Sequence, residues 1–100
     1  MNMLILTPYA YAALRDAADD YAPGDPCREA VEALPGRRLQ IDGVHPEDRL
    51  LLSQVAQLYA SEIHIYSKAR GRLGRARDSL CAWELRRFSA KLRRSLAAAP

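Results

Sequence analysis

The sequence has no long apolar run and only two cysteines, which argues against a membrane protein and against a disulfide-rich secreted protein. No stretch reaches the roughly 18 consecutive apolar residues that cross a bilayer. The opening letters, MNMLILTPY, lack the positive charge and the length of a secretory signal. Cys27 and Cys81 stand alone, and in a reducing compartment such residues are usually small buried side chains rather than a disulfide. We therefore expect a cytoplasmic protein with no membrane contact.

The sequence also lacks the spacings of a metal or nucleotide site. Four side chains could in principle bind zinc, but no two of them have C-x-x-C or H-x-x-x-H spacing: Cys27, His45, His64 and Cys81. The glycines of GRLGR, residues 71–75, are not followed by the G-K-[ST] of a phosphate-binding loop. We expect neither a metal nor a cofactor.

Side chains with the spacing of a catalytic group are missing as well. Ser61, Glu62 and His64 are close in the sequence, but adjacent residues of a helix point in different directions. They would not face one another as nucleophile and base. We therefore expect that the protein is not an enzyme.

What the chain does contain is typical of a small helical protein. It has 100 residues, of which 49% are apolar and 27% charged, and this composition suits a single domain over residues 1–100. Alanine is abundant and β-branched residues are few, so helices are favoured over strands.

The net charge of +3 hides a strong asymmetry along the chain. Residues 1–48 hold nine acids and four bases, whereas residues 68–100 hold two acids and ten bases. An asymmetry of this kind bears on the partners of a protein rather than on its fold.

Three capping patterns predict where helices begin. Thr7, Asp25 and His45 each precede a proline, which is well tolerated in a first helical turn because its missing N–H needs no partner there. A fourth helix is expected after a break at the two glycines of GRLGR. The predicted helices span residues 8–21, residues 26–34, about six turns from residue 46, and residues 75–97.

The remaining segments are predicted to be short and extended. The alternation in RRLQIDG indicates an extended connector or a small β-hairpin near residues 36–44, and MLIL near the start suits a short strand or a packed tail. The predicted fold is therefore all-α. It is a small bundle of about four helices with a long C-terminal antiparallel pair.

Trp83 is predicted to lie outside the core. The apolar stripe of the last helix has helical spacing and consists of Cys81, Leu85, Phe88, Leu92 and Leu96. At 100° per residue, Trp83 lies roughly 160° from Cys81, on the far side of the helix. Phe88 should therefore be buried, whereas Trp83 should lie among arginines.

Three interpretations of Trp83 are open. It could form a second apolar strip with Leu73, Ala76 and Leu80 that packs against the N-terminal helices. It could anchor a protein partner, because tryptophan and arginine are enriched at interface hot spots. It could also stack on a nucleic-acid base while the arginines contact phosphates.

The candidate partner-binding residues form a basic group and an acidic group. The basic helix contributes Arg75, Trp83, Arg86, Arg87 and Arg94. The first helix contributes Asp16, Asp19 and Asp20, whose carboxylates could occupy a cationic groove that normally holds a nucleic-acid backbone. Tyr9 is expected near this acidic face.

In size, helical build and uneven charge, the chain resembles the small phage-encoded anti-CRISPR proteins that inhibit type I surveillance complexes. This resemblance concerns general character and carries no motif. It implies a non-enzymatic inhibitor that binds a large ribonucleoprotein and blocks its binding of target DNA. The alternative is an accessory protein that binds DNA or RNA directly through the basic C-terminal helix.

Overall fold

The computed structural model describes residues 3–67 and 71–97, without the side chains of His64, Tyr66 and Ser67. The described residues are mostly helical, as predicted, and two short strands pair with each other. Short 3-10 turns cover Ala18–Asp20 and Ile41–Gly43. The main elements are β1 (Met3–Ile5), α1 (Pro8–Ala17), α2 (Pro26–Glu32), β2 (Arg38–Gln40), α3 (Pro46–Ser67) and α4 (Arg72–Ala97).

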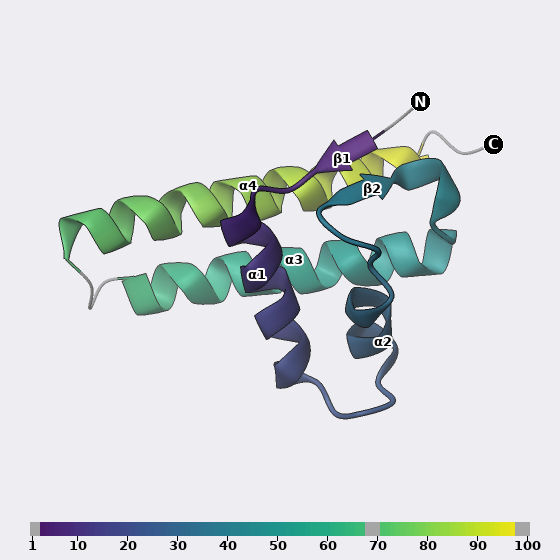
Figure 1. Ribbon diagram of the computed structural model, residues 1–100, viewed down its shortest axis with the longest axis horizontal. Coiled ribbons are helices and arrows are strands. Elements are labelled where there is room, and N and C mark those ends of the chain that lie inside the picture. Colours follow the sequence, from purple (N-terminus) through teal and green to yellow (C-terminus); the bar gives the residue numbers. More distant parts are fainter. Residues whose placement is uncertain (1–2, 68–70, 98–100) are drawn as a thin grey trace.

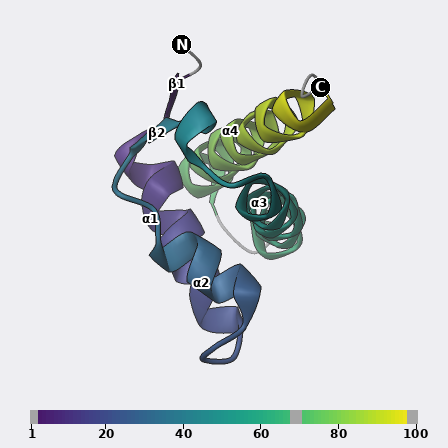
Figure 2. The ribbon, with the colours of Figure 1, turned by 90° about the vertical axis from the view of Figure 1, so that its right-hand side faces the viewer.

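The elements form two layers. The long helices α3 and α4 lie antiparallel as a hairpin, and the N-terminal elements cover one side of it (Figures 1 and 2). The molecule measures 45 × 30 × 21 Å, and the hairpin follows its longest dimension. No helix in residues 3–67 or 71–97 is long and apolar enough to span a lipid bilayer.

All three predicted helix starts are confirmed, and each has a side-chain cap. A backbone N–H of the first turn donates to Thr7 Oγ1 at 3.3 Å, to Asp25 Oδ1 at 2.8 Å and to His45 Nδ1 at 3.2 Å. These contacts satisfy amide groups that have no partner within the helix. The local sequence therefore determines where α1, α2 and α3 begin.

The helix ends differ from the prediction by a few residues. Helix α1 changes to a 3-10 turn after Ala17, and α2 ends at Glu32. Helix α4 begins at Arg72, because the carbonyl oxygen of Gly71 accepts the N–H of Arg75 at 2.9 Å. The second glycine of GRLGR thus lies inside α4, and residues 68–70 are outside the described residues.

The extended connector is confirmed, but it is not a hairpin. Strand β2 pairs antiparallel with β1 at the other end of the N-terminal region, with Leu4 opposite Leu39. The N–H of Leu6 extends the ladder by donating to the carbonyl oxygen of Arg37 at 2.9 Å. Strands β1 and β2 together form a short β ribbon. Leu4, Leu6 and Leu39 are buried beneath this ribbon, so the start of the chain packs against the α3–α4 hairpin.

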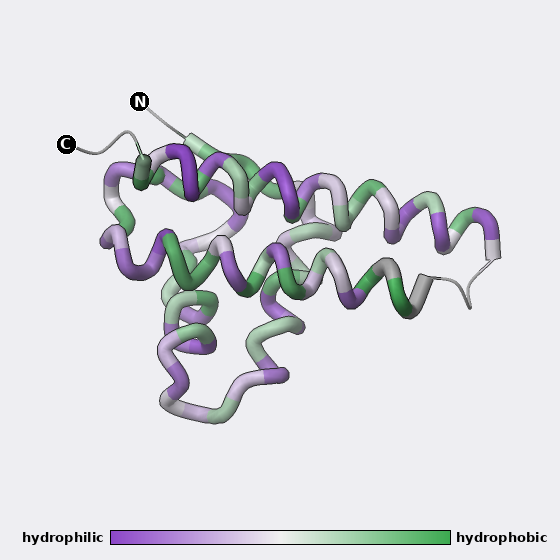
Figure 3. Tube along the Cα trace, turned by 180° about the vertical axis from the view of Figure 1, so that it is seen from behind, coloured by the Kyte–Doolittle hydropathy of each residue, from purple (hydrophilic) through white to green (hydrophobic). Residues whose placement is uncertain are grey.

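The core follows the predicted apolar stripe of α4. Four of the five α4 stripe residues are buried and Leu96 is half-buried, whereas Leu58 of α3 is exposed. Figure 3 shows polar and apolar residues alternating along both helices. The buried seam between them also contains small residues, which allow close approach: Ser53, Ala56, Ala60, Ala82 and Ser89. The Ser89 hydroxyl crosses this seam and donates to the Ser53 carbonyl oxygen at 2.8 Å.

Candidate docking surface on helix α4

Trp83 lies outside the core, as predicted. Its side of α4 is open, so 58% of the residue is exposed, compared with 3% for Phe88 five positions later. The Arg87 guanidinium lies over the indole ring, 5.4 Å from its centroid. This cation–π contact holds the charged group beside an exposed aromatic face.

Trp83 continues a strip of apolar residues along α4 that no other element in the described part of the chain covers. Leu73, Ala76, Leu80 and Trp83 follow one another at steps of three, four and three residues, so they share one face of the helix. Leu73 is 88% exposed and Leu80 is 68% exposed. The interpretation that this α4 strip packs against the N-terminal helices is therefore wrong.

The position of α1 explains why the strip is left open. The Glu84 carboxylate holds the first residue before α1: it accepts the Thr7 N–H at 2.9 Å and the Thr7 hydroxyl at 3.0 Å. From this anchor α1 runs across the hairpin toward α3 (Figure 1). Residues 72–76 of α4 therefore extend beyond α1, whereas Leu80 and Trp83 lie on a side of α4 that α1 does not bury. Because Thr7 and Glu84 are 77 residues apart, no local pattern indicated this contact.

Tyr9 lies beside the α4 strip and not beside the acidic group, which corrects the expectation from the sequence. Its hydroxyl donates to Asp78 Oδ1 at 3.4 Å, and the Arg77 guanidinium lies 5.4 Å from its ring centroid. An open groove of about 580 Å³ is lined by Tyr9, Arg77, Leu80 and Trp83, among others. The lining of this groove is mainly apolar, and its charged residues are Arg77 and Glu84.

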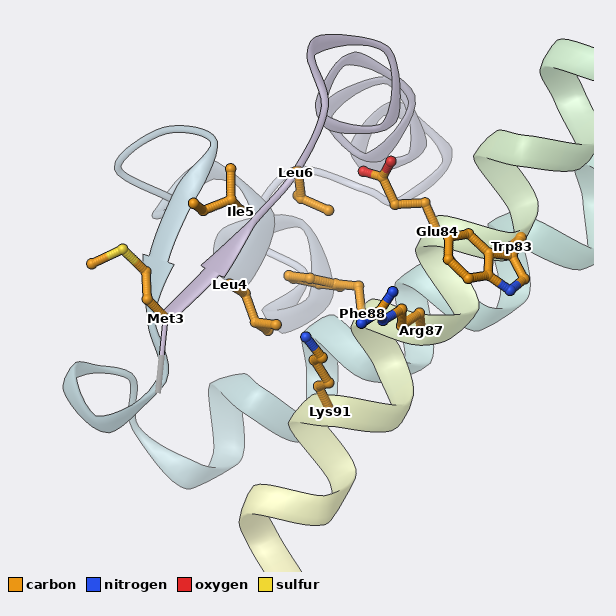
Figure 4. Close-up of a pocket in the computed structure, with 9 residues that line it drawn as sticks. All are labelled: Met3, Leu4, Ile5, Leu6, Trp83, Glu84, Arg87, Phe88 and Lys91. Atoms are coloured by element: carbon orange, nitrogen blue, oxygen red, sulfur yellow. The ribbon is translucent and has the colours of Figure 1, made fainter. Parts of the chain in front are cut away.

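A second groove lies on the other side of Trp83, between β1 and α4 (Figure 4). Its volume is about 360 Å³. Residues 3–6 form one wall, and α4 contributes the other wall with Trp83, Glu84, Arg87, Phe88 and Lys91. Trp83 thus lines both grooves, which makes it the centre of the candidate surface.

The other predicted basic residues are distributed along α4. Arg75, Arg86 and Arg94 are exposed, and within residues 3–67 and 71–97 none of them lies in an ion pair. Arg86 and Arg87 are one turn from Trp83, whereas Arg94 is about three turns away. The structure therefore brings Arg87 to the indole and leaves Arg75 and Arg94 at a distance.

The acidic group lies elsewhere. Asp16, Asp19 and Asp20 are exposed at the end of α1 that is remote from α4 (Figure 1). Asp19 approaches Arg28 at 3.9 Å. Burial raises the pKa of Tyr59 on α3, and the nearby carboxylates of Asp16 and Asp20 raise it further. The two predicted contact groups thus do not form one continuous surface.

The cysteines and histidines do not form a reactive site in the described part of the chain. Both cysteines are free, and burial raises the pKa of Cys81 to about 11, helped by Glu84 and Asp78. A thiol with such a pKa is a poor nucleophile near neutral pH. His45 caps α3, while the side chain of His64 is outside the described residues. Within those residues no group of three or more potential metal ligands occurs.

Comparison with known proteins gives no further guidance. No protein-family model, curated protein sequence or solved structure matches this chain. The candidate surface is therefore defined by its own geometry.

Proposed function

We propose that the protein is a non-enzymatic protein-binding module that docks through the α4 strip. The observation that carries this proposal is the exposure of Leu73, Leu80 and Trp83 on one face of a well-packed helix. A continuous apolar patch with a polar rim is typical of an interaction site. Tryptophan beside arginine is also the composition of interface hot spots.

The charges around the strip favour a partner of opposite sign. Arg77 and Arg87 flank the apolar side chains, and residues 68–100 carry ten bases against two acids. Two α4 strips brought face to face would repel each other, whereas apolar side chains flanked by carboxylates would be attracted. The partner surface that fits is therefore apolar and acidic.

For the identity of the partner, we propose an assembly that handles nucleic acid, in line with the resemblance to anti-CRISPR proteins. On this proposal the chain inhibits a type I surveillance complex by preventing target DNA from binding. The remote acidic group of Asp16, Asp19 and Asp20 would provide a second contact, because its carboxylates carry the same charge as a phosphate backbone. The α4 strip and the acidic group would then contact different parts of a large complex.

The docking proposal is tested by affinity capture from the natural host followed by mass spectrometry. A double variant, Leu80→Ala with Trp83→Ala, should lose a partner that the unmodified chain retains. Leu50→Ala is the matched control, because Leu50 is an exposed apolar residue on α3. Equal capture by the double variant would refute the proposed surface.

The narrower proposal is tested in cells that carry a type I system. Expression of the chain should raise the transformation efficiency of a targeted plasmid to that of an untargeted one. The Leu80→Ala, Trp83→Ala variant should not do so. Unchanged interference would reject inhibition of that system, while the capture experiment would still test docking.

Direct nucleic-acid binding is the second candidate, and it is favoured by the basic character of α4. A gel-shift titration with duplex and single-stranded DNA over a salt series separates the two candidates. Direct binding predicts a log–log salt slope of about 0.9 per phosphate neutralised. Protein docking predicts no shift at physiological salt.

A further inference from the structure

Among the residues that the structure describes, none pairs with the second edge of strand β1. The N–H of Leu6 points to β2, where it bonds to the carbonyl oxygen of Arg37. In an antiparallel pair this orientation alternates, so Leu4 also faces β2, whereas the backbone N–H and C=O groups of Met3 and Ile5 face away from it. An edge of this kind can pair with another chain.

This free edge borders the groove between β1 and α4. All four residues from Met3 to Leu6 line the groove, and no residue of β2 does. Figure 4 shows β2 on one side of β1 and the α4 side chains on the other. The unpaired backbone groups of β1 therefore share this groove with Arg87 and Lys91, and Trp83 lies farther along it (Figure 4).

We infer that an extended, acidic segment of the partner adds to β1 as a third strand in this groove, along the wall that faces Arg87 and Lys91. The inference rests on the proposed docking function and specifies how the partner is held. Backbone hydrogen bonds to Met3 and Ile5 would supply affinity, as in other cases of strand addition. Arg87 and Lys91 would pair with carboxylates of the segment, and the Trp83 indole would cover an apolar side chain.

The groove fits an extended segment better than a helix or a second copy. A helix satisfies its own backbone groups and would leave the β1 edge unpaired. A second copy would offer its own β1, whose residues Met3–Ile5 carry no acid, and would bring two basic α4 helices together. Glu84 also lines the groove, but its carboxylate already accepts two hydrogen bonds from Thr7.

The test uses Ile5→Pro, which removes an outward N–H and leaves the bond from Leu6 to Arg37 in place. Proline is tolerated on strand edges for this reason. The matched control is Ile5→Ala, which shortens the same exposed side chain but keeps the N–H. The circular dichroism spectrum and thermal unfolding of both variants establish that they are folded.

The probe is a phage-displayed library of random dodecapeptides, selected on the full chain. The enriched peptides should contain alternating apolar residues with Asp or Glu. Synthetic copies should shift the fluorescence of Trp83, the only tryptophan of the chain. Ile5→Pro should weaken binding about tenfold or more, and Ile5→Ala should bind within about threefold of the unmodified chain. The Ile5 amide should also become protected from hydrogen exchange in the complex.

Each other outcome counts against strand addition. An empty selection, or equal binding to Ile5→Pro, would overturn it. If peptides bind the Ile5→Pro variant normally but no longer bind the Trp83→Ala variant, the result supports docking on α4 and refutes strand addition. Self-association of the unmodified chain that Ile5→Pro abolishes would make a second copy the occupant, and would also overturn the inference.

Discussion

Trp83 and Phe88 are five residues apart on one helix and have opposite environments. Five residues correspond to about 140° of rotation, which is enough to move a side chain from the seam to the far side. Phe88 is buried between α4 and the β ribbon, whereas Trp83 has a guanidinium on one face and open grooves beside it. The two aromatic residues should therefore contribute very differently to stability.

We expect Trp83→Ala to change the free energy of unfolding by less than about 0.5 kcal/mol, because Trp83 is already exposed in the folded protein. Phe88→Ala should cost about 3–5 kcal/mol through the cavity it leaves. Urea denaturation followed by circular dichroism measures both values. A loss above about 2 kcal/mol for Trp83→Ala would show that the indole is part of the core.

Cys81 makes stability depend on pH. Its pKa is raised from the ordinary value of 9.0 to about 11, mainly by burial, so the unfolded chain loses this proton first. The stabilisation is fully present below pH 9.0 and declines as the pH rises toward about 11. The midpoint temperature of thermal unfolding should therefore fall more steeply with pH over this range for the unmodified chain than for the Cys81→Ala variant. Parallel curves for the two proteins would contradict this assignment.

At the scale of elements, local chemistry determines where helices begin and distant contacts determine where they lie. Thr7 illustrates both effects. Its hydroxyl accepts an N–H from the first turn of α1, and its N–H and hydroxyl donate to Glu84 on α4. The same residue thus starts a helix and fixes that helix on the hairpin.

We expect Glu84→Ala to lower the free energy of unfolding by about 1–2 kcal/mol, because two donors on Thr7 lose a charged acceptor. A double-mutant cycle with Thr7→Val should give a coupling energy of about 0.5–1.5 kcal/mol. Glu32→Ala is the control, since the pairing of its exposed carboxylate with Arg28 one turn away on α2 should contribute less than about 0.5 kcal/mol. A coupling energy near zero would mean that the contact does not anchor α1.

At the scale of the whole molecule, the hairpin is longer than the layer that covers it. No residue of Arg72–Arg77 is buried, whereas α4 is packed from Asp78 to Leu92 under α1 and the ribbon. The α4 strip begins on the uncovered part with Leu73 and Ala76 and continues along the exposed side of the packed part with Leu80 and Trp83. The acidic group lies at the remote end of α1. The molecule thus presents two surfaces of opposite charge at separate places.

Hydrogen exchange should reveal this uneven packing. Amides of residues 76 and 77 should exchange at least about tenfold faster than those of residues 85–89, because no side chain in this first part of α4 is buried. Exchange followed by NMR measures these rates within one helix, so the two segments serve as internal references. Equal protection along α4 would show that the hairpin opens only as a unit.

The sequence by itself determined the starts of α1, α2 and α3, the buried stripe of α4 and the position of Trp83 on the side of α4 opposite this stripe. These features depend on caps and on helical periodicity, which are properties of neighbouring residues. Tertiary structure decided the pairing of β1 with β2, the anchoring of Thr7 on Glu84, the position of Tyr9 and the uncovered state of Leu73 and Leu80. It also separated the acidic group from the basic helix. Each of these features depends on contacts between residues far apart in the chain. The hydrophobic effect is non-directional, so a local apolar pattern does not specify which distant residues a side chain will contact.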